Sequence, residues 1–358
     1  MSKLFEKLLR PLLFKLDPER AHELGIEALK LGAGSIFGAR HDENILEVER
    51  FGLKFANPLG IAAGFDKNGV VVNQLAGLGF GFVEVGTVTL EPQPGNEKPR
   101  LFRLPDDRAL INRLGFNNQG AKTIAGRLEK MSRKCVLGVN IGKNKDVPNE
   151  EAVENYFRCF EVVRDVADYI AVNVSSPNTP NLRELQKTEN LEDLLTAIQR
   201  QNERDPVGGA PKPLLVKIAP DLSEAEIEGI ADVCIRLKVA GIIATNTTIG
   251  RGGLRTPDLE KFGGGGLSGR PLSNRSTEVI LQIYRYSNGK LPIVGVGGIF
   301  AAADAFEKIA AGASLLQAYT GFVYGGPSFA SDVNAGLAKI LRERGFPSLD
   351  EAVGSAVK

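Results

Sequence analysis

The sequence predicts an α/β fold, a (β/α)8 TIM barrel with an N-terminal two-helix extension. Three observations lead to it: eight short apolar segments alternate with helical patterns, polar residues follow nearly every apolar segment, and no linker interrupts the series. Such alternation is typical of a parallel sheet covered by helices. The expected strands are 59–63, 82–87, 136–141, 169–174, 214–218, 241–245, 293–296 and 314–319.

The first forty residues differ from the rest of the chain. Apolar residues recur at helical spacing, with basic residues between them: Leu4, Phe5, Leu8, Leu9, Leu12 and Leu13, with Lys3, Lys7 and Arg10. Asp17 and Pro18 then predict an N-cap and first turn for a second helix over 19–31, which Gly32 to Gly34 would end. Two interpretations remain open. The pair is either a hairpin packed on the barrel or an amphipathic element lying on a membrane surface.

The remaining elements follow in order. A short hairpin is expected at 51–55, and helical patterns occur at 119–131, 153–166, 191–201 and 224–237. A long proline-rich insert, 91–110, follows the second strand. We therefore expect a helical extension over 1–42, a barrel domain over 43–345 and a C-terminal tail over 346–358.

Composition excludes several classes of function. The 358 residues are 43% hydrophobic and 24% charged, with a net charge of +1, so nucleic acid is not an expected partner. The three cysteines are odd in number and widely spaced, which indicates a reducing compartment and neither a disulfide framework nor a zinc site. With only His22 and His41, a histidine metal centre or a Ser-His-Asp triad is excluded, and no metal is expected. No run approaches the ~20 apolar residues of a membrane span.

Polar and glycine residues gather where the expected strands end. In a barrel these ends form one face, the face that carries the active site. The residues concerned are Lys67, Thr87, Asn140, Asn173 with Ser176, Lys217, Thr245 to Thr247, Gly297 with Gly298, and Tyr319 with Thr320. A single residue of this kind would be explained by a structural role, but eight groups of them on one face predict an active or binding site.

Lys217 lies inside an apolar strand, where an ammonium group needs a partner. Three roles remain open from the residues alone: a Schiff base as in aldolases, a cation beside an electron-accepting ring, or a structural ion pair. The glycine-rich segments, including 263–269, predict backbone binding of a phosphate. Asparagines 112, 117, 173, 178 and 246 offer donors and acceptors for a small amide ring, and Lys67 would neutralise a carboxylate on it.

Six motifs, in order, resemble those of the dihydroorotate dehydrogenase family. They are Ala-Ala-Gly-Phe-Asp-Lys (62–67), Ile-Asn-Arg-Leu-Gly-Phe-Asn-Asn (111–118), Asn-Val-Ser-Ser-Pro-Asn-Thr (173–179), Ala-Thr-Asn-Thr-Thr (244–248), Gly-Leu-Ser-Gly-Arg-Pro-Leu (266–272) and Val-Gly-Val-Gly-Gly-Ile (294–299). The chain looks like the quinone-linked class 2 form for two reasons. Ser176 stands where class 1 members have cysteine, and the N-terminal pair with Leu-Asp-Pro-Glu-Arg-Ala-His (16–22) is absent from class 1. Asn181 departs from the glycine common in the family, and asparagine tolerates φ > 0.

The resemblance implies FMN as cofactor and Ser176 as the catalytic base. It assigns the flavin to Ala62, Ala63, Gly64, Thr87, Asn140, Asn173, Lys217, Thr245, Ser268, Gly269, Gly297, Gly298, Tyr319 and Thr320. It assigns dihydroorotate to Lys67, Asn112, Arg113, Leu114, Gly115, Phe116, Asn173, Asn178, Asn246 and Thr247. A route for quinone would pass His22, Arg103 and Tyr319.

The resemblance also implies a reaction and a location. Dihydroorotate would be oxidised to orotate at a CH–CH bond, in de novo pyrimidine (UMP) biosynthesis, and a membrane quinone would reoxidise the flavin. The protein would be peripheral to a bacterial cell membrane, on its cytoplasmic face, through the N-terminal helices, with no protein partner evident. The competing hypotheses are a flavin-free aldolase using Lys217, a class 1-like enzyme with a soluble acceptor, and a non-catalytic scaffold.

Overall fold

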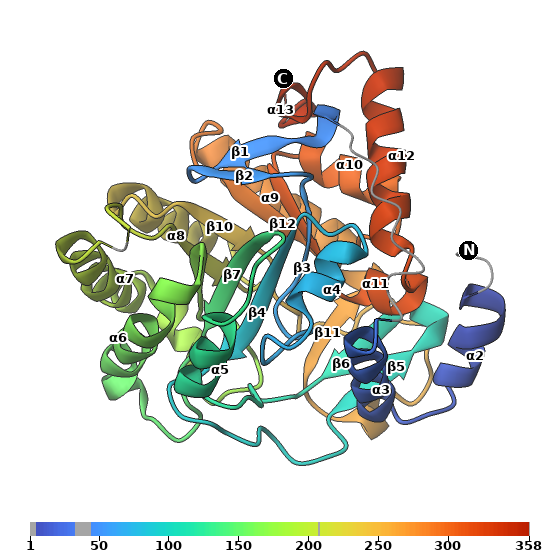
Figure 1. The fold of residues 1–358 in the computed structure, drawn as a ribbon, viewed down its shortest axis with the longest axis horizontal. Coiled ribbons are helices and arrows are strands. Elements are labelled where there is room, and N and C mark those ends of the chain that lie inside the picture. Colours follow the sequence, from blue (N-terminus) through green and yellow to red (C-terminus); the bar gives the residue numbers. More distant parts are fainter. Residues whose placement is uncertain (1–4, 33–43, 207, 358) are drawn as a thin grey trace.

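Eight parallel strands close into a barrel (Figure 1). The computed structural model describes residues 5–32, 44–206 and 208–357. The barrel strands, in spatial order, are β3 (Leu59–Ile61), β4 (Phe82–Val88), β7 (Val136–Ile141), β8 (Tyr169–Asn173), β9 (Leu214–Ile218), β10 (Gly241–Ala244), β12 (Ile293–Val296) and β13 (Leu315–Ala318). All eight expected strands are present, with ends that differ by at most two residues. The predicted barrel is confirmed.

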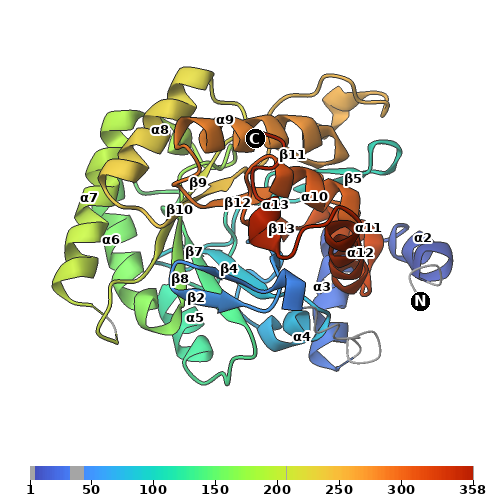
Figure 2. The ribbon, with the colours of Figure 1, turned by 90° about the horizontal axis from the view of Figure 1, so that it is seen from above.

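Helices surround the strands (Figure 2). They are α4 (Val72–Gly77), α5 (Ala121–Leu128), α6 (Ala152–Val163), α7 (Thr188–Arg204), α8 (Glu224–Arg236), α9 (Ser273–Tyr286), α10 (Ala302–Ala310), α11 (Thr320–Gly325), α12 (Phe329–Glu343) and α13 (Leu349–Ala352). In α7 the buried residues Leu191, Leu194, Leu195 and Ile198 follow helical spacing, so one face packs on the barrel. A capping box between Ser223 and Glu226 fixes the start of α8. The four helical patterns predicted from sequence correspond to α5 to α8.

A β-hairpin lies at the N-terminal end of the barrel strands. It consists of β1 (Val48–Arg50) and β2 (Leu53–Phe55), with Phe51 and Gly52 in the left-handed region between them. Phe55 meets the ring of Phe82, the first residue of β4, with centroids 5.3 Å apart. The hairpin predicted at 51–55 is therefore longer than expected, and its first strand was missed.

A small antiparallel sheet joins two segments that are far apart in sequence. β6 (Ala109–Asn112) lies between β5 (Leu101–Leu104) and β11 (Gly266–Gly269). The sequence predicted a proline-rich insert at 91–110 and a glycine-rich loop at 263–269, with no strand in either. The pairing of β11 with β6 explains why residue 265 is a glycine, because a Cβ at Gly265 would lie 2.6 Å from the backbone oxygen of Asn112.

The N-terminal helices lie beside this small sheet (Figures 1 and 2). A π-helical turn over Phe5–Leu9 leads into α2 (Arg10–Leu13), and α3 spans Pro18–Lys30. The carboxylate of Asp17 accepts from the backbone N–H groups of Glu19 and Arg20, both at 3.0 Å, as the predicted N-cap requires. Lys3, Leu4, Gly34 and the expected boundary at 42/43 lie outside the described residues.

Two arginines hold the N-terminal helices against the barrel domain. Arg100 pairs with Glu19 of α3 in a buried bidentate ion pair, with N–O distances of 2.7 to 3.2 Å. Arg103, on β5, donates to the backbone oxygens of Phe14 and Leu16 at 3.0 and 2.9 Å. In the described ranges, no helix is long and apolar enough to cross a membrane.

Candidate active site

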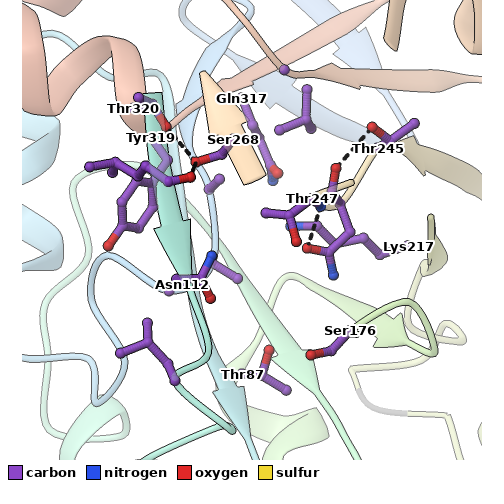
Figure 3. Close-up of a pocket in the computed structure, with 18 of the residues that line it drawn as sticks. Thr87, Asn112, Ser176, Lys217, Thr245, Thr247, Ser268, Gln317, Tyr319 and Thr320 are labelled. Atoms are coloured by element: carbon purple, nitrogen blue, oxygen red, sulfur yellow. Dashed lines mark hydrogen bonds between the residues drawn. The ribbon is translucent and has the colours of Figure 1, made fainter. Parts of the chain in front are cut away.

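A cavity of about 140 Å³ lies at the carboxyl ends of the barrel strands (Figure 3). Its walls come from loops after the barrel strands and from the small sheet. Of the residues that the sequence singled out for cofactor or substrate, these line it: Ala62, Ala63, Gly64, Lys67, Thr87, Asn112, Leu114, Gly115, Phe116, Asn117, Asn173, Ser176, Asn178, Lys217, Thr245, Asn246, Thr247, Ser268, Gly269, Gly297, Gly298, Tyr319 and Thr320. The strand-end residues therefore converge on one space.

Two predicted site residues do not line this cavity. Asn140 is fully buried beneath it and accepts a hydrogen bond from Thr87 Oγ1 at 2.6 Å. Arg113 is occupied elsewhere: its guanidinium lies 4.7 Å from the ring centroid of Phe102 and donates to the backbone oxygens of Phe262 and Gly264. Arg113 thus holds the loop before β11, and its assignment to the dihydroorotate-binding set stays a prediction.

Asn173 is the centre of a buried amide network. Its Nδ2 donates to Thr87 Oγ1 at 3.0 Å and to Asn140 Oδ1 at 3.2 Å, and its Oδ1 accepts from Ser175 Oγ at 2.8 Å. Asn246 Nδ2 donates to the same Ser175 hydroxyl at 2.9 Å. Because each group is fixed by several partners, the network holds strands β4, β7 and β8 in register beneath the cavity.

Ser176 faces the cavity from the loop after β8. Its side chain is nearly buried, and its Oγ accepts from the backbone N–H of Asn178 at 3.2 Å. Asn178 Nδ2 in turn donates to Asn112 Oδ1 at 3.2 Å. Asn181 closes the same loop in the left-handed region, with φ of 55°, as the sequence predicted for an asparagine at that position.

Lys67 lies where the cavity meets the N-terminal helices. Its Nζ is 3.5 Å from Nε2 of His22, on α3. Burial lowers the pKa of Lys67 to about 8, although the carboxylate of Glu19 opposes this shift. Burial and the Lys67 charge lower the pKa of His22 to about 3, so the imidazole is neutral at physiological pH.

Lys217 forms part of the cavity wall. Behind it lies a carboxylate, Glu84, that the sequence did not lead us to expect at the site. Glu84, on β4, is fully buried, and its Oε1 is 3.8 Å from Lys217 Nζ. Burial lowers the pKa of Lys217, and Glu84 opposes that shift. Gln317, on β13, also lines the cavity and was missed. The sequence carried a signal for both residues, because Glu84 and Gln317 each place a polar side chain within a mostly apolar strand.

The glycine turns form a close-packed end of the cavity. Gly297 and Gly298 have φ of 130° and 71°, and a Cβ at Gly298 would lie 2.4 Å from Ser273 Cβ. Nearby, the hydroxyls of Ser268 and Thr320 are 2.8 Å apart (Figure 3). Backbone groups and hydroxyls converge here without side-chain bulk, an arrangement suited to an anion such as a phosphate.

A second cavity, of about 300 Å³, lies between the N-terminal helices and the barrel domain. Its lining is mostly apolar, with contributions from Phe5, Leu9, Leu13, Phe65 and Phe322, and it includes His22 and Arg103. Tyr319 lines both cavities. The three residues expected along an acceptor route therefore border one apolar space that adjoins the first cavity.

Known proteins resemble this chain over nearly its whole length. The family model described as dihydroorotate dehydrogenase matches residues 45–341. A dihydroorotate dehydrogenase (quinone) of Christiangramia forsetii is 52% identical over 92% of this chain and 98% of its own. One from Gloeobacter violaceus is 52% identical over 98% of both chains. The crystal structure of DHODH from Eimeria tenella in complex with ferulenol has a TM-score of 0.89 and 41% identity, and the match covers 96% of each chain.

Proposed function

The chain belongs to the dihydroorotate dehydrogenase family, and from that membership we propose that it oxidises dihydroorotate to orotate with FMN as cofactor and a membrane quinone as final acceptor. The observation that carries the proposal is the convergence of the motif residues on one cavity, adjoining a second, apolar one. The step would serve pyrimidine biosynthesis.

The residues present fit a flavin mononucleotide. The cradle at Gly297 and Gly298 and the hydroxyls of Ser268 and Thr320 suit its phosphate. Lys217 and the buried Oε1 of Gln317, which has no hydrogen-bond partner among the described residues, suit the polar edge of the ring. When bound, this group supplies a two-electron acceptor beside the substrate.

Substrate binding is assigned to other residues that line the same cavity. Lys67 is the cation placed to pair with the carboxylate of dihydroorotate, and the side chains of Asn112, Asn173, Asn178 and Asn246 present amides to the ring. The hydrogen bond between Asn178 and Asn112 fixes these two amides before the ligand arrives. Preorganised donors of this kind reduce the cost of orienting a bound ring.

Ser176 is assigned the proton transfer. It takes a proton from the carbon next to the substrate carbonyl, while the hydride leaves the adjacent carbon. A serine hydroxyl is a weak base in water, so the step needs a closed site and a relay. Thr179 is the candidate for that relay, because its buried Oγ1 makes no hydrogen bond to any described residue.

The second cavity is assigned to the quinone, and the N-terminal helices to the membrane surface. Several leucines of these helices are exposed, among them Leu8 at 58%, Leu12 at 61% and Leu31 at 88%. An apolar outer surface next to an apolar cavity suits entry of a lipid-soluble acceptor directly from a bilayer. The proposal also includes the expected division of the chain into a helical extension that ends at residue 42 and a barrel domain that ends at residue 345.

The proposal is tested by the cofactor and by the choice of acceptor. Heat-released flavin should be FMN, one per chain. Dihydroorotate oxidation should proceed with a short-chain ubiquinone analogue and fail with NAD⁺ or fumarate, which distinguishes this proposal from a class 1-like enzyme. A folded protein that takes up no flavin, or one that prefers a soluble acceptor, would contradict it.

A further inference from the structure

A buried carboxylate lies behind the wall of the cavity and has no place in the reaction as described. Glu84 is 0% exposed and does not line the cavity. Three donors reach it: Asn140 Nδ2 at 2.9 Å, Tyr169 Oη at 3.0 Å and Gln317 Nε2 at 2.7 Å. A carboxylate accepts hydrogen bonds and donates none, so this set of three donors suits the ionised form.

The only cation paired with Glu84 among the described residues is Lys217, at 3.8 Å. Lys217 lines the cavity and Glu84 does not, so the ammonium lies between the cavity and the carboxylate. Both groups are nearly or fully buried, where charges interact more strongly than in water. A ligand bound over Lys217 is therefore exposed to the positive charge of the lysine. The negative charge of Glu84, which lies farther from the ligand, partly offsets it.

Glu84 also fixes the orientation of Gln317. Since a carboxylate can only accept, the amide nitrogen of Gln317 must face Glu84, and its Oε1 is left without a partner among the described residues. Gln317, from β13, and Lys217, from β9, both line the same cavity (Figure 3). One buried carboxylate thus determines how a cation and an acceptor are presented to the ligand.

We propose that Glu84 is a positioning residue that holds down the reduction potential of the bound flavin by anchoring Lys217 and offsetting its charge. The inference rests on the proposed function, because it takes the flavin ring to bind over Lys217. Reduction adds negative charge to the ring, which an unopposed ammonium would favour. With Glu84 in place the ring is reduced by the substrate but still gives up its electrons to an acceptor.

The direct test is Glu84→Gln, which keeps the size of the side chain, removes its charge and replaces one acceptor oxygen by an amide nitrogen. Spectroelectrochemical titration of the flavin-loaded protein should show a more positive potential. The expected change is at least tenfold in favour of the reduced flavin, or ~30 mV for a two-electron couple. The matched control is Tyr169→Phe, which removes one hydrogen bond to Glu84 and no charge, and its shift should be much smaller. A Glu84→Gln protein that binds flavin at the wild-type potential, or that shifts no more than the control, overturns the proposal.

A second comparison applies if Glu84→Gln does not accumulate as folded protein. The double variant Glu84→Gln/Lys217→Gln leaves no unpaired buried charge, which is the main threat to folding. Its flavin should have a higher potential than that of Lys217→Gln alone, in which the carboxylate remains. Equal potentials would overturn the proposal. Failure of all these proteins, wild type included, to bind flavin would instead contradict the proposed function.

Discussion

Ser176 is the residue on which the proposed proton transfer depends. Its hydroxyl lies in the cavity wall, held by the N–H of Asn178 and shielded from water. Ser176→Ala should slow reduction of the flavin by dihydroorotate about 10²-fold or more, the usual scale for loss of a positioned base. Stopped-flow measurement under anaerobic conditions gives this rate.

Ser175→Ala is the matched control for that experiment. It removes the neighbouring hydroxyl, which donates to Asn173 and accepts from Asn246 and does not line the cavity. Orotate affinity should survive Ser176→Ala, because Lys67 and the asparagines are unchanged. If Ser176→Ala reduces its flavin as fast as the wild type, another group is the base.

Lys67 gives the ligand site a pH dependence whose sign follows from burial. Its pKa is lowered to about 8, so the free site is cationic below that pH and becomes neutral as the pH rises through it. Orotate, an anion, should therefore bind more weakly as the pH rises above about 8. Fluorescence or absorbance titration from pH 6 to 9.5 measures this.

Lys67→Gln should bind orotate weakly at every pH and lose the decline above pH 8. The neighbouring charges of Glu19, Arg100 and Asp66 are retained in this variant, so they serve as an internal control. His22 does not contribute over this range, because its pKa is about 3. A wild-type profile that stays flat, or a variant with the same decline, would rule out this role for Lys67.

Side chains at the site differ in how far the sequence predicts them. Asn173 was singled out because it is a polar residue at the end of a buried strand, and Ser176 because it follows that strand in a polar segment. Glu84 and Gln317 lie inside strands. Nothing in the sequence shows that β4 and β13 bring Gln317 Nε2 to 2.7 Å from Glu84 Oε2. The side-chain direction of Arg113 was likewise beyond prediction, because its aromatic partner is set by the β5–β6 pairing.

At the scale of elements, the N-terminal helices join the two cavities. α3 supplies His22 to both the apolar cavity and the contact with Lys67, and its Glu19 holds Arg100. Arg100 also donates to the backbone oxygens of Pro94 and Asn96, at 2.7 and 2.8 Å. The second cavity and the loops around the first are therefore tied together by one ion pair.

Removal of these helices tests their proposed role. A chain that starts at Glu43 should lose binding to anionic liposomes, because it loses the exposed leucines and the basic residues beside them. Turnover with long-tailed quinones should fall by roughly tenfold or more, the loss expected when ~1.4 kcal/mol of binding is removed. Vesicle sedimentation and quinone-dependent assays measure the two effects.

A small dye acceptor is the control for the truncated chain. Because the barrel cavity keeps its strands, bleaching by dihydroorotate and dye reduction should persist in flavin-loaded protein. Circular dichroism should show the barrel folded, with a lower melting temperature because Arg100 loses Glu19. Full liposome binding together with full quinone turnover would mean that the helices merely pack on the domain.

For the molecule as a whole, the sequence was sufficient for the barrel and the face that carries the site. Runs such as Tyr169–Asn173 are apolar on both faces, which only a covered parallel sheet explains. The sheet of β5, β6 and β11 could not be predicted, because its strands are four residues long and β11 pairs with β6 across about 150 positions. Such pairing depends on how the barrel brings the two loops together, and no local pattern records it.

The central claim is that one chain takes a hydride from dihydroorotate in the barrel cavity and passes the electrons to a quinone. The most direct test is an anaerobic double-mixing experiment on the full-length, flavin-loaded protein. Addition of dihydroorotate should bleach the visible absorbance of the flavin, and a short-chain ubiquinone analogue added next should restore it. Flavin that stays oxidised in the presence of dihydroorotate, in protein that is folded and fully loaded, would contradict the account.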